Sequence, residues 1–291
     1  MVGNGVVTLS GASHPNIHWL PDPFVLAPIL VLVMIYVRRF RAVRREAAEA
    51  QSRPRGAGAA QAAAFTGAIL ALLLALASPL DALGEDYLFS AHMLQHVLLG
   101  DIAPVLLLLS LSRVLLRPLT RRLMGLERAL GPFASPVTGI ALWLFMMYLW
   151  HVPALYEAAI TNPFVHLLEH ACFFTAGVAV WWPLIQPVPM RRRLSGLWTV
   201  AYIGSAKFGL AALGLYLTWS GNVLYEYYEG LPRIWGLDAV EDQNAGGAIM
   251  MVEQSLTFVI ALVVLFAAML RQSETDELRR ERLEDAAAAK P

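Results

Sequence analysis

The sequence contains a single cysteine, Cys172, among its 291 residues. One cysteine excludes a disulfide scaffold, a cysteine-rich zinc module and a CxC or CxxC motif, because each of these needs a second thiol. Charged residues are also scarce, at 15% of the chain, against about 25% in ordinary soluble domains. The formal net charge is zero, whereas domains that bind nucleic acid are basic. We therefore expect no nucleic-acid partner.

Apolar residues, in contrast, make up 57% of the chain. A helix needs about 20 mostly apolar residues to cross a bilayer. Segments of this kind predict an all-α fold, a polytopic membrane helix bundle with seven transmembrane helices, at residues 19–37, 62–78, 87–112, 136–152, 163–184, 197–219 and 245–270. The membrane domain then covers residues 19–270, between an outer N-terminal tail (1–18) and a charged cytoplasmic tail (271–291).

The basic residues predict the orientation, because loops that stay in the cytoplasm keep their Lys and Arg. All but two of the 22 Lys and Arg residues follow the first, third, fifth or seventh predicted span. The exceptions are Arg233, in an outer loop, and Lys207, inside a span. This alternation places the N-terminus outside and the C-terminus in the cytoplasm of a bacterial cytoplasmic (inner) membrane. Trp181 lies near the inner end of its span, a position typical of interfacial aromatic residues.

Four of the seven histidines form two pairs with i,i+4 spacing in the outer halves of two predicted spans. The pairs are His92 with His96, in HMLQH, and His166 with His170, in HLLEH. This spacing puts both imidazoles of a pair on one face of a helix. Imidazole binds Cu, Zn, Fe and Ni, and polar residues at this depth are costly and usually functional. The two pairs together therefore predict a metal site, ahead of four separate buried histidines.

Other side chains are candidates to complete or support this site: Glu169, Met93, Asp242, Met250 and Glu253. Glu169 precedes His170 and is a candidate ligand or an acceptor for an imidazole N–H. The methionines would favour Cu(I). Glu253 is a candidate for proton handling or for a buried contact between helices. We interpret His14, His18 and His151 as tail or helix-end residues.

Asp101 and Lys207 are predicted to lie at similar depths in two different spans. An unpaired charge there is expensive, so we expect a structural ion pair. Asp101 follows His92 by nine residues, which places it on the opposite face of an ideal helix, away from the metal site. Pro104 cannot donate to the carbonyl of Gly100 and is expected to kink this helix there, which would bring the two regions closer.

The chain resembles the CtaG family of polytopic cytochrome c oxidase assembly factors in five strings: WLPDPF, HMLQHVLLGDIAPVLLLL, LWHVPALYEAA, HLLEHACFF and DQNAGGAIMM. The resemblance covers residues 19–270. It implies a multi-pass, non-enzymatic protein that helps to form a haem–copper oxidase by inserting copper into subunit I. The implied partners are cytochrome c oxidase subunit I, other assembly or copper chaperone proteins, and the lipid bilayer. The positions that it emphasises are the four paired histidines and Asp242.

Copper, as Cu(I), is the expected cofactor, with zinc or haem as alternatives. A haem-binding membrane oxidoreductase would use one histidine from each pair. It would leave the second histidine of each i,i+4 pair unexplained. A retinal-type protein would need Lys207, which does not lie in the last span. A metal-dependent membrane hydrolase would use Glu169 as its base, but four histidine ligands leave little room for an activated water. The oligomeric state is not predicted.

Overall fold

The structure, a computed structural model, describes residues 19, 22–188, 194 and 196–288. The described residues form helices joined by turns and short loops, with no strand among them. The tail with His14 and His18 and the loop with Arg191, Arg192 and Arg193 lie outside the described residues. The elements in chain order are α1 (Pro23–Glu49), α2 (Ala59–Leu76), α3 (Pro79–Asp86), α4 (Phe89–Val97), η1 (Leu98–Ile102), α5 (Ala103–Ser110), α6 (Thr120–Leu130), η2 (Gly131–Phe133), α7 (Pro136–Trp150), α8 (Pro153–Thr161), α9 (Pro163–Ile185), α10 (Leu197–Trp219), η3 (Glu226–Gly230) and α11 (Ala239–Ala288).

Six helical segments within the described chain are long and apolar enough to cross a membrane. A seventh candidate is the bent pair Thr120–Phe133 and Pro136–Trp150, whose two arms meet at 77°. The bend has a local cause, because the Ser135 hydroxyl accepts from the amide of Thr138 and Pro136 follows at the first helical position. Both features start a new helix. The predicted all-helical fold is confirmed for the described residues, with six to seven candidate membrane spans.

The predicted third span is interrupted at its middle. A π-helical turn, η1, separates α4 from α5 and contains Gly100 and Asp101. It lies directly ahead of Pro104, where the missing proline N–H was expected to disturb the helix. The neighbouring α9 approaches this turn closely: a Cβ added at Gly177 would lie 1.9 Å from the carbonyl oxygen of Gly100. Only glycine permits this contact between the two backbones.

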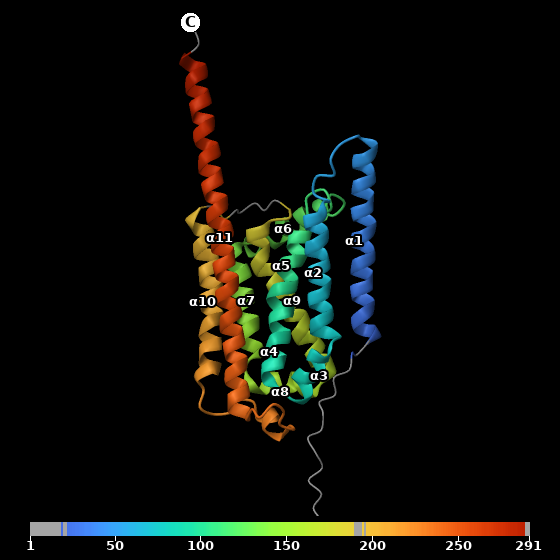
Figure 1. The fold of residues 1–291 in the computed structure, drawn as a ribbon, viewed down its shortest axis with the longest axis vertical. Coiled ribbons are helices and arrows are strands. Elements are labelled where there is room, and N and C mark those ends of the chain that lie inside the picture. Colours follow the sequence, from blue (N-terminus) through green and yellow to red (C-terminus); the bar gives the residue numbers. More distant parts are fainter. Residues whose placement is uncertain (1–18, 20–21, 189–193, 195, 289–291) are drawn as a thin grey trace, which may run out of the picture.

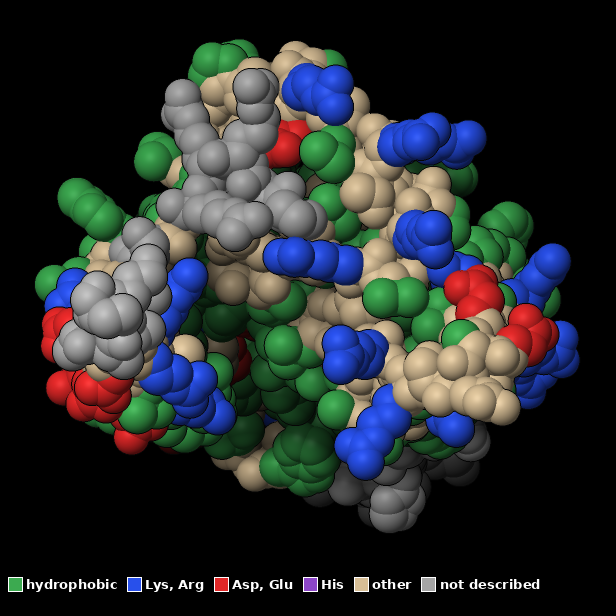
Figure 2. Space-filling model, turned by 90° about the horizontal axis from the view of Figure 1, so that it is seen from above, with side chains coloured by type: hydrophobic (Ala, Val, Ile, Leu, Met, Phe, Trp, Pro, Cys, Tyr) green, Lys and Arg blue, Asp and Glu red, His purple; other side chains and the backbone are tan. Residues whose placement is uncertain are grey.

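The loops that carry the arginines lie together at one end of the bundle. The end of α1, the α5–α6 connection and the C-terminal part of α11 all lie at this end, and α11 projects beyond the other helices (Figure 1). Figure 2 views this end and shows Lys and Arg side chains spread over it. We call it the basic end. The short elements α3 and α8 lie at the opposite end (Figure 1).

The largest packed core lies among α4, α7, α9, α10 and α11, around Trp143, Phe173 and Leu210. The helix α1 stands at the edge and contacts the rest mainly through α2, where Tyr36 stacks on Phe65 at 3.7 Å between ring centres. The helix α11 continues without a break from the apolar segment into the charged tail. The functional candidates are therefore held by the central helices, not by the peripheral one.

Candidate metal centre

Four potential metal ligands converge in the half of the bundle that faces away from the basic end. They are His92 and His96 on α4, and Glu169 and His170 on α9. One ligand atom from each of the four lies within 4.8 Å of the others. We call this group the His/Glu cluster. Its two helices face each other, so the i,i+4 pair on α4 meets two adjacent residues of α9.

The ligand groups of the cluster are buried and lack hydrogen-bond partners. His92 and Glu169 have no exposed surface, and His96 and His170 are nearly as buried. Within the described part of the chain, no partner is found for either ring nitrogen of His92 and His96, for Nε2 of His170 or for either oxygen of Glu169. His96 Nε2 lies 3.8 Å from Glu169 Oε1, too far for a hydrogen bond. Buried polar groups almost always have a hydrogen-bond partner in proteins. These unpartnered nitrogen and oxygen atoms therefore fit a bound cation.

Ring spacing agrees with a shared ion for two of the three histidine pairs. Metal–nitrogen bonds of about 2.0–2.1 Å place two ring centres on one ion about 5 Å apart at a tetrahedral angle and about 6.4 Å apart when the rings lie on opposite sides of the ion. The ring centres are 5.7 Å apart for His96 and His170 and 6.4 Å apart for His92 and His170. His92 and His96 are closer, at 4.2 Å. Binding by all three histidines therefore requires a rotation of one of the imidazoles on α4.

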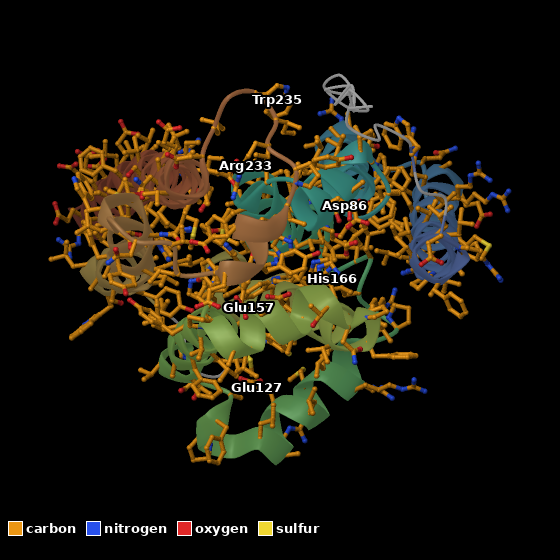
Figure 3. The ribbon with its side chains drawn as sticks, turned by 90° about the horizontal axis from the view of Figure 1, so that it is seen from below. Asp86, Glu127, Glu157, His166, Arg233 and Trp235 are labelled. Carbon is orange, nitrogen blue, oxygen red and sulfur yellow. The ribbon has the colours of Figure 1, made fainter. Side chains whose placement is uncertain are left out.

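His166, the remaining member of the predicted set, lies beside the cluster. Its ring centre is 4.0 Å from that of His170 and 5.4 Å from that of His92. Its Nδ1 lies 2.8 Å from a carboxylate oxygen of Glu85. Figure 3, viewed from the end opposite the basic end, shows His166 near the middle, between the elements that carry Asp86 and Glu157. The structure thus groups three of the predicted histidines with Glu169 and places His166 on the side nearest this end.

His151 also lies near the cluster, which the sequence did not indicate. It follows the last residue of α7 and is only 6% exposed. Its Nδ1 lies 2.6 Å from the carbonyl oxygen of Met147, and its ring centre is 6.3 Å from that of His96. Tyr225, from the loop between α10 and α11, donates to the carbonyl of His151. The only signal in the sequence was the position of His151 at the end of a helix. Its burial could not be predicted, because the loop that covers it is distant along the chain.

Asp242 acts at the beginning of α4. Its two carboxylate oxygens accept the amides of Phe89 and Ser90, at 2.7 and 3.1 Å. A carboxylate is favourable at a helix N-terminus, where amides lack partners. Close contact of α11 with α4 depends on Gly246, where an added Cβ would lie 2.5 Å from the Phe89 ring and 3.1 Å from Met93. Asp242 thus positions the helix that carries the histidine pair, and it does not join the His/Glu cluster.

Tyrosines close the bundle on the side of the His/Glu cluster. Tyr228, in η3, donates to the carbonyl of Gly84 at 2.8 Å. Its hydroxyl is 3.0 Å from that of Tyr156, whose ring centre is 5.3 Å from that of His92. Burial raises the pKa of the Tyr228 phenol, so the phenol stays neutral. No periodic pattern in the sequence indicates these contacts, which join three separate segments.

A second polar group lies deeper in the bundle. Lys207 on α10 pairs with Asp101, and its Nζ lies 3.7 Å from a carboxylate oxygen of Glu253 on α11. Trp181, which the sequence indicated as an interfacial residue, is instead buried and donates its indole N–H to Asp101. Gln254 donates to Glu253. We call Asp101, Lys207 and Glu253 the buried ion triad.

Asp101 does not point away from the histidines as it would on an ideal helix, which agrees with the approach that the kink at Pro104 allowed. Asp101 and His96 line one cavity of about 20 Å³. The estimate from the sequence used an ideal α-helix, but the π-helical turn η1 contains more residues per turn and changes the direction of Asp101. Glu253, Met93 and Met250 line the same cavity. The triad and the His/Glu cluster are therefore neighbours along the bundle.

Comparison with known proteins adds one family and a few relatives. The family model for the cytochrome c oxidase caa3 assembly factor matches residues 17–272. An uncharacterized protein of Mycobacterium leprae is 26% identical, over 93% of this chain and 42% of its own length. An uncharacterized protein of Mycobacterium bovis is 27% identical, over 92% of this chain and 42% of its own length. The chain thus spans less than half the length of these relatives. No solved structure matches it.

Proposed function

The chain belongs to the cytochrome c oxidase caa3 assembly factor family, and we propose that it serves oxidase assembly by binding copper at the His/Glu cluster. The observation that carries this proposal is the convergence of His92, His96, Glu169 and His170, whose ligand atoms lie within 4.8 Å of one another. The copper would then pass to cytochrome c oxidase subunit I, directly or through a chaperone. The role is one of transfer and not of catalysis.

Charge balance favours Cu(I) at this cluster. Three neutral imidazoles and one carboxylate carry a single negative charge, so a monovalent ion leaves the site neutral. Zn²⁺ or Cu²⁺ would leave one positive charge in the membrane interior, where an uncompensated charge is costly. Imidazole ligands also suit copper. A haem is disfavoured because bis-histidine ligation would use two of the four ligand groups and leave a buried imidazole and the Glu169 carboxylate without a role.

Orientation follows from the basic end. If the positive-inside rule applies, the basic end faces the cytoplasm and the His/Glu cluster lies toward the outer face of a bacterial cytoplasmic membrane. Acidic side chains surround that end, with Glu85 at 2.8 Å from His166 and Asp86 and Glu157 nearby (Figure 3). The negative electrostatic potential of these acidic side chains concentrates cations. Copper would therefore enter and leave through the outer side.

The test is anaerobic Cu(I) titration of the purified protein against a coloured chelator. We carry it out in a Cys172→Ala background, because the free thiol of Cys172 would itself bind Cu(I). Tight binding is expected, and His92→Ala and His170→Ala should each abolish it at the cluster. Restoration of oxidase activity in a deletion strain should fail for the same variants. Unchanged binding in both histidine variants would refute the proposal, and a Soret band or stoichiometric zinc would identify a different cofactor.

A further inference from the structure

We propose that the cavity between the His/Glu cluster and the buried ion triad is a second binding site for Cu(I). Its ligands are the imidazoles of His151 and His96 and the thioethers of Met93 and Met250. This inference rests on the proposed function and deepens it, because it gives the chain two sites in series. We call the two the outer site, at the His/Glu cluster, and the inner site, at the cavity.

His151 has the arrangement of a histidine prepared to bind a metal. Its Nδ1 lies 2.6 Å from the carbonyl oxygen of Met147 and donates to it, which leaves the lone pair on Nε2. Metal-binding histidines commonly donate their other ring N–H to a backbone carbonyl in this way. Nε2 is buried and finds no partner among the described residues. A histidine with only a helix-end role would place this nitrogen in solvent or in a hydrogen bond.

The spacing and the ligand types fit a soft ion. The ring centres of His96 and His151 are 6.3 Å apart, close to the separation of about 6.4 Å expected for two imidazoles on opposite sides of one ion. Met93 and Met250 are buried and line the cavity. Thioether sulfur selects Cu(I). The cavity, of about 20 Å³, holds about one water molecule, so a bare ion fits and a hydrated one does not.

The charge around the cavity also suits a monovalent cation. Asp101 and Glu253 line it, and the ammonium of Lys207 is paired with Asp101 and lies near Glu253. Two carboxylates and one ammonium carry one negative charge in excess when all are ionised. A single Cu(I) in the cavity balances that charge without leaving the low-dielectric interior. With Glu253 ionised by the bound cation, each of the two sites would have one compensating negative charge of its own.

His96 belongs to both sites, which explains how copper would move between them. Neither of its ring nitrogens has a partner within the described residues. Its ring centre lies 5.7 Å from that of His170 on one side and 6.3 Å from that of His151 on the other. Rotation of this imidazole would exchange one neighbour for the other. The transfer is a change of ligands, with no oxidation or reduction of the ion.

The experiment combines Cu(I) titration with X-ray absorption on the full chain in the Cys172→Ala background. We expect a second equivalent of Cu(I) per chain, held by His151, Met93 and Met250 while His96 remains on the outer ion, and sulfur scattering that appears as it binds. Met93→Leu with Met250→Leu removes both sulfurs at similar volume and should remove the sulfur signal and the second equivalent. Met251→Leu is the matched control, because the sulfur of Met251 lies 3.7 Å from the Thr218 hydroxyl and does not line the cavity. His151→Gln should act like the double leucine variant.

The outcomes separate this inference from the proposed function. A single equivalent that is lost in His170→Ala, shows no sulfur scattering and is unaffected by His151→Gln would refute the inner site and leave the outer site standing. No copper binding in the parent protein would refute both. Circular dichroism and gel filtration of every variant verify folding. If His151→Gln fails to fold, the leucine variants decide the question, because Leu and Met have similar volumes.

Discussion

The buried ion triad predicts that the loss of Lys207 costs more folding stability than the loss of Asp101. The side chains of Lys207 and Asp101 are only 5% and 2% exposed. Removing one partner of a buried ion pair costs about 3–5 kcal/mol. Lys207→Met leaves two carboxylates, Asp101 and Glu253, without a cation, so we expect the upper value of about 5 kcal/mol. Asp101→Asn leaves Lys207 with Glu253 at 3.7 Å, so about 3 kcal/mol is expected.

The double variant Asp101→Asn with Lys207→Met completes the cycle. It removes both charges of the pair and leaves only Glu253, so its cost should be about 5 kcal/mol or less, well below the sum of about 8 kcal/mol for the single changes. The assay is reversible unfolding in mixed micelles, followed by tryptophan fluorescence, since Trp181 donates to Asp101. Additive costs would show that Lys207 and Asp101 do not interact. A larger cost for Asp101→Asn than for Lys207→Met would refute the role assigned to Glu253.

Three further predictions follow from single contacts. Asp242→Ala removes the acceptor at the start of α4 and should cost about 2 kcal/mol in unfolding measurements and weaken copper binding. Gly177→Ala should destabilise the protein by about 3 kcal/mol or more, since its Cβ would lie 1.9 Å from the carbonyl oxygen of Gly100. The control is Gly125→Ala, which should be neutral or slightly stabilising because an added Cβ there has nothing within 4 Å. Glu169→Gln should lower Cu(I) affinity by about 10- to 100-fold without unfolding the chain, and equal affinity would exclude Glu169 from the site.

The spacing of residues along the chain was enough to predict the helices, the histidine pairs and the position of the arginine-rich loops. Apolar segments near the length of a bilayer predicted the helices, because burial of the backbone in lipid requires helical hydrogen bonding. The i,i+4 spacing of His92 with His96 put both imidazoles on one face of α4, since that spacing is set by helix geometry alone. The alternation of arginines predicted that their loops would lie at one end, and the described loops do.

The composition of the candidate site, in contrast, depended on how separate helices are rotated and packed. The sequence favoured His166 over Glu169 as a ligand, but in the structure Glu169 lies in the cluster and His166 contacts Glu85 on α3 instead. The burial of His151 depends on a loop more than 70 residues away, through Tyr225.

The direction of Asp101 depended on the π-helical turn η1. That turn lies where α9 contacts the Gly100 carbonyl at Gly177. Helix periodicity is a local property and can be read from neighbouring residues. A ligand set cannot be read in this way. Which side chains meet depends on the rotation of one helix against another and on the irregular turn within one of them.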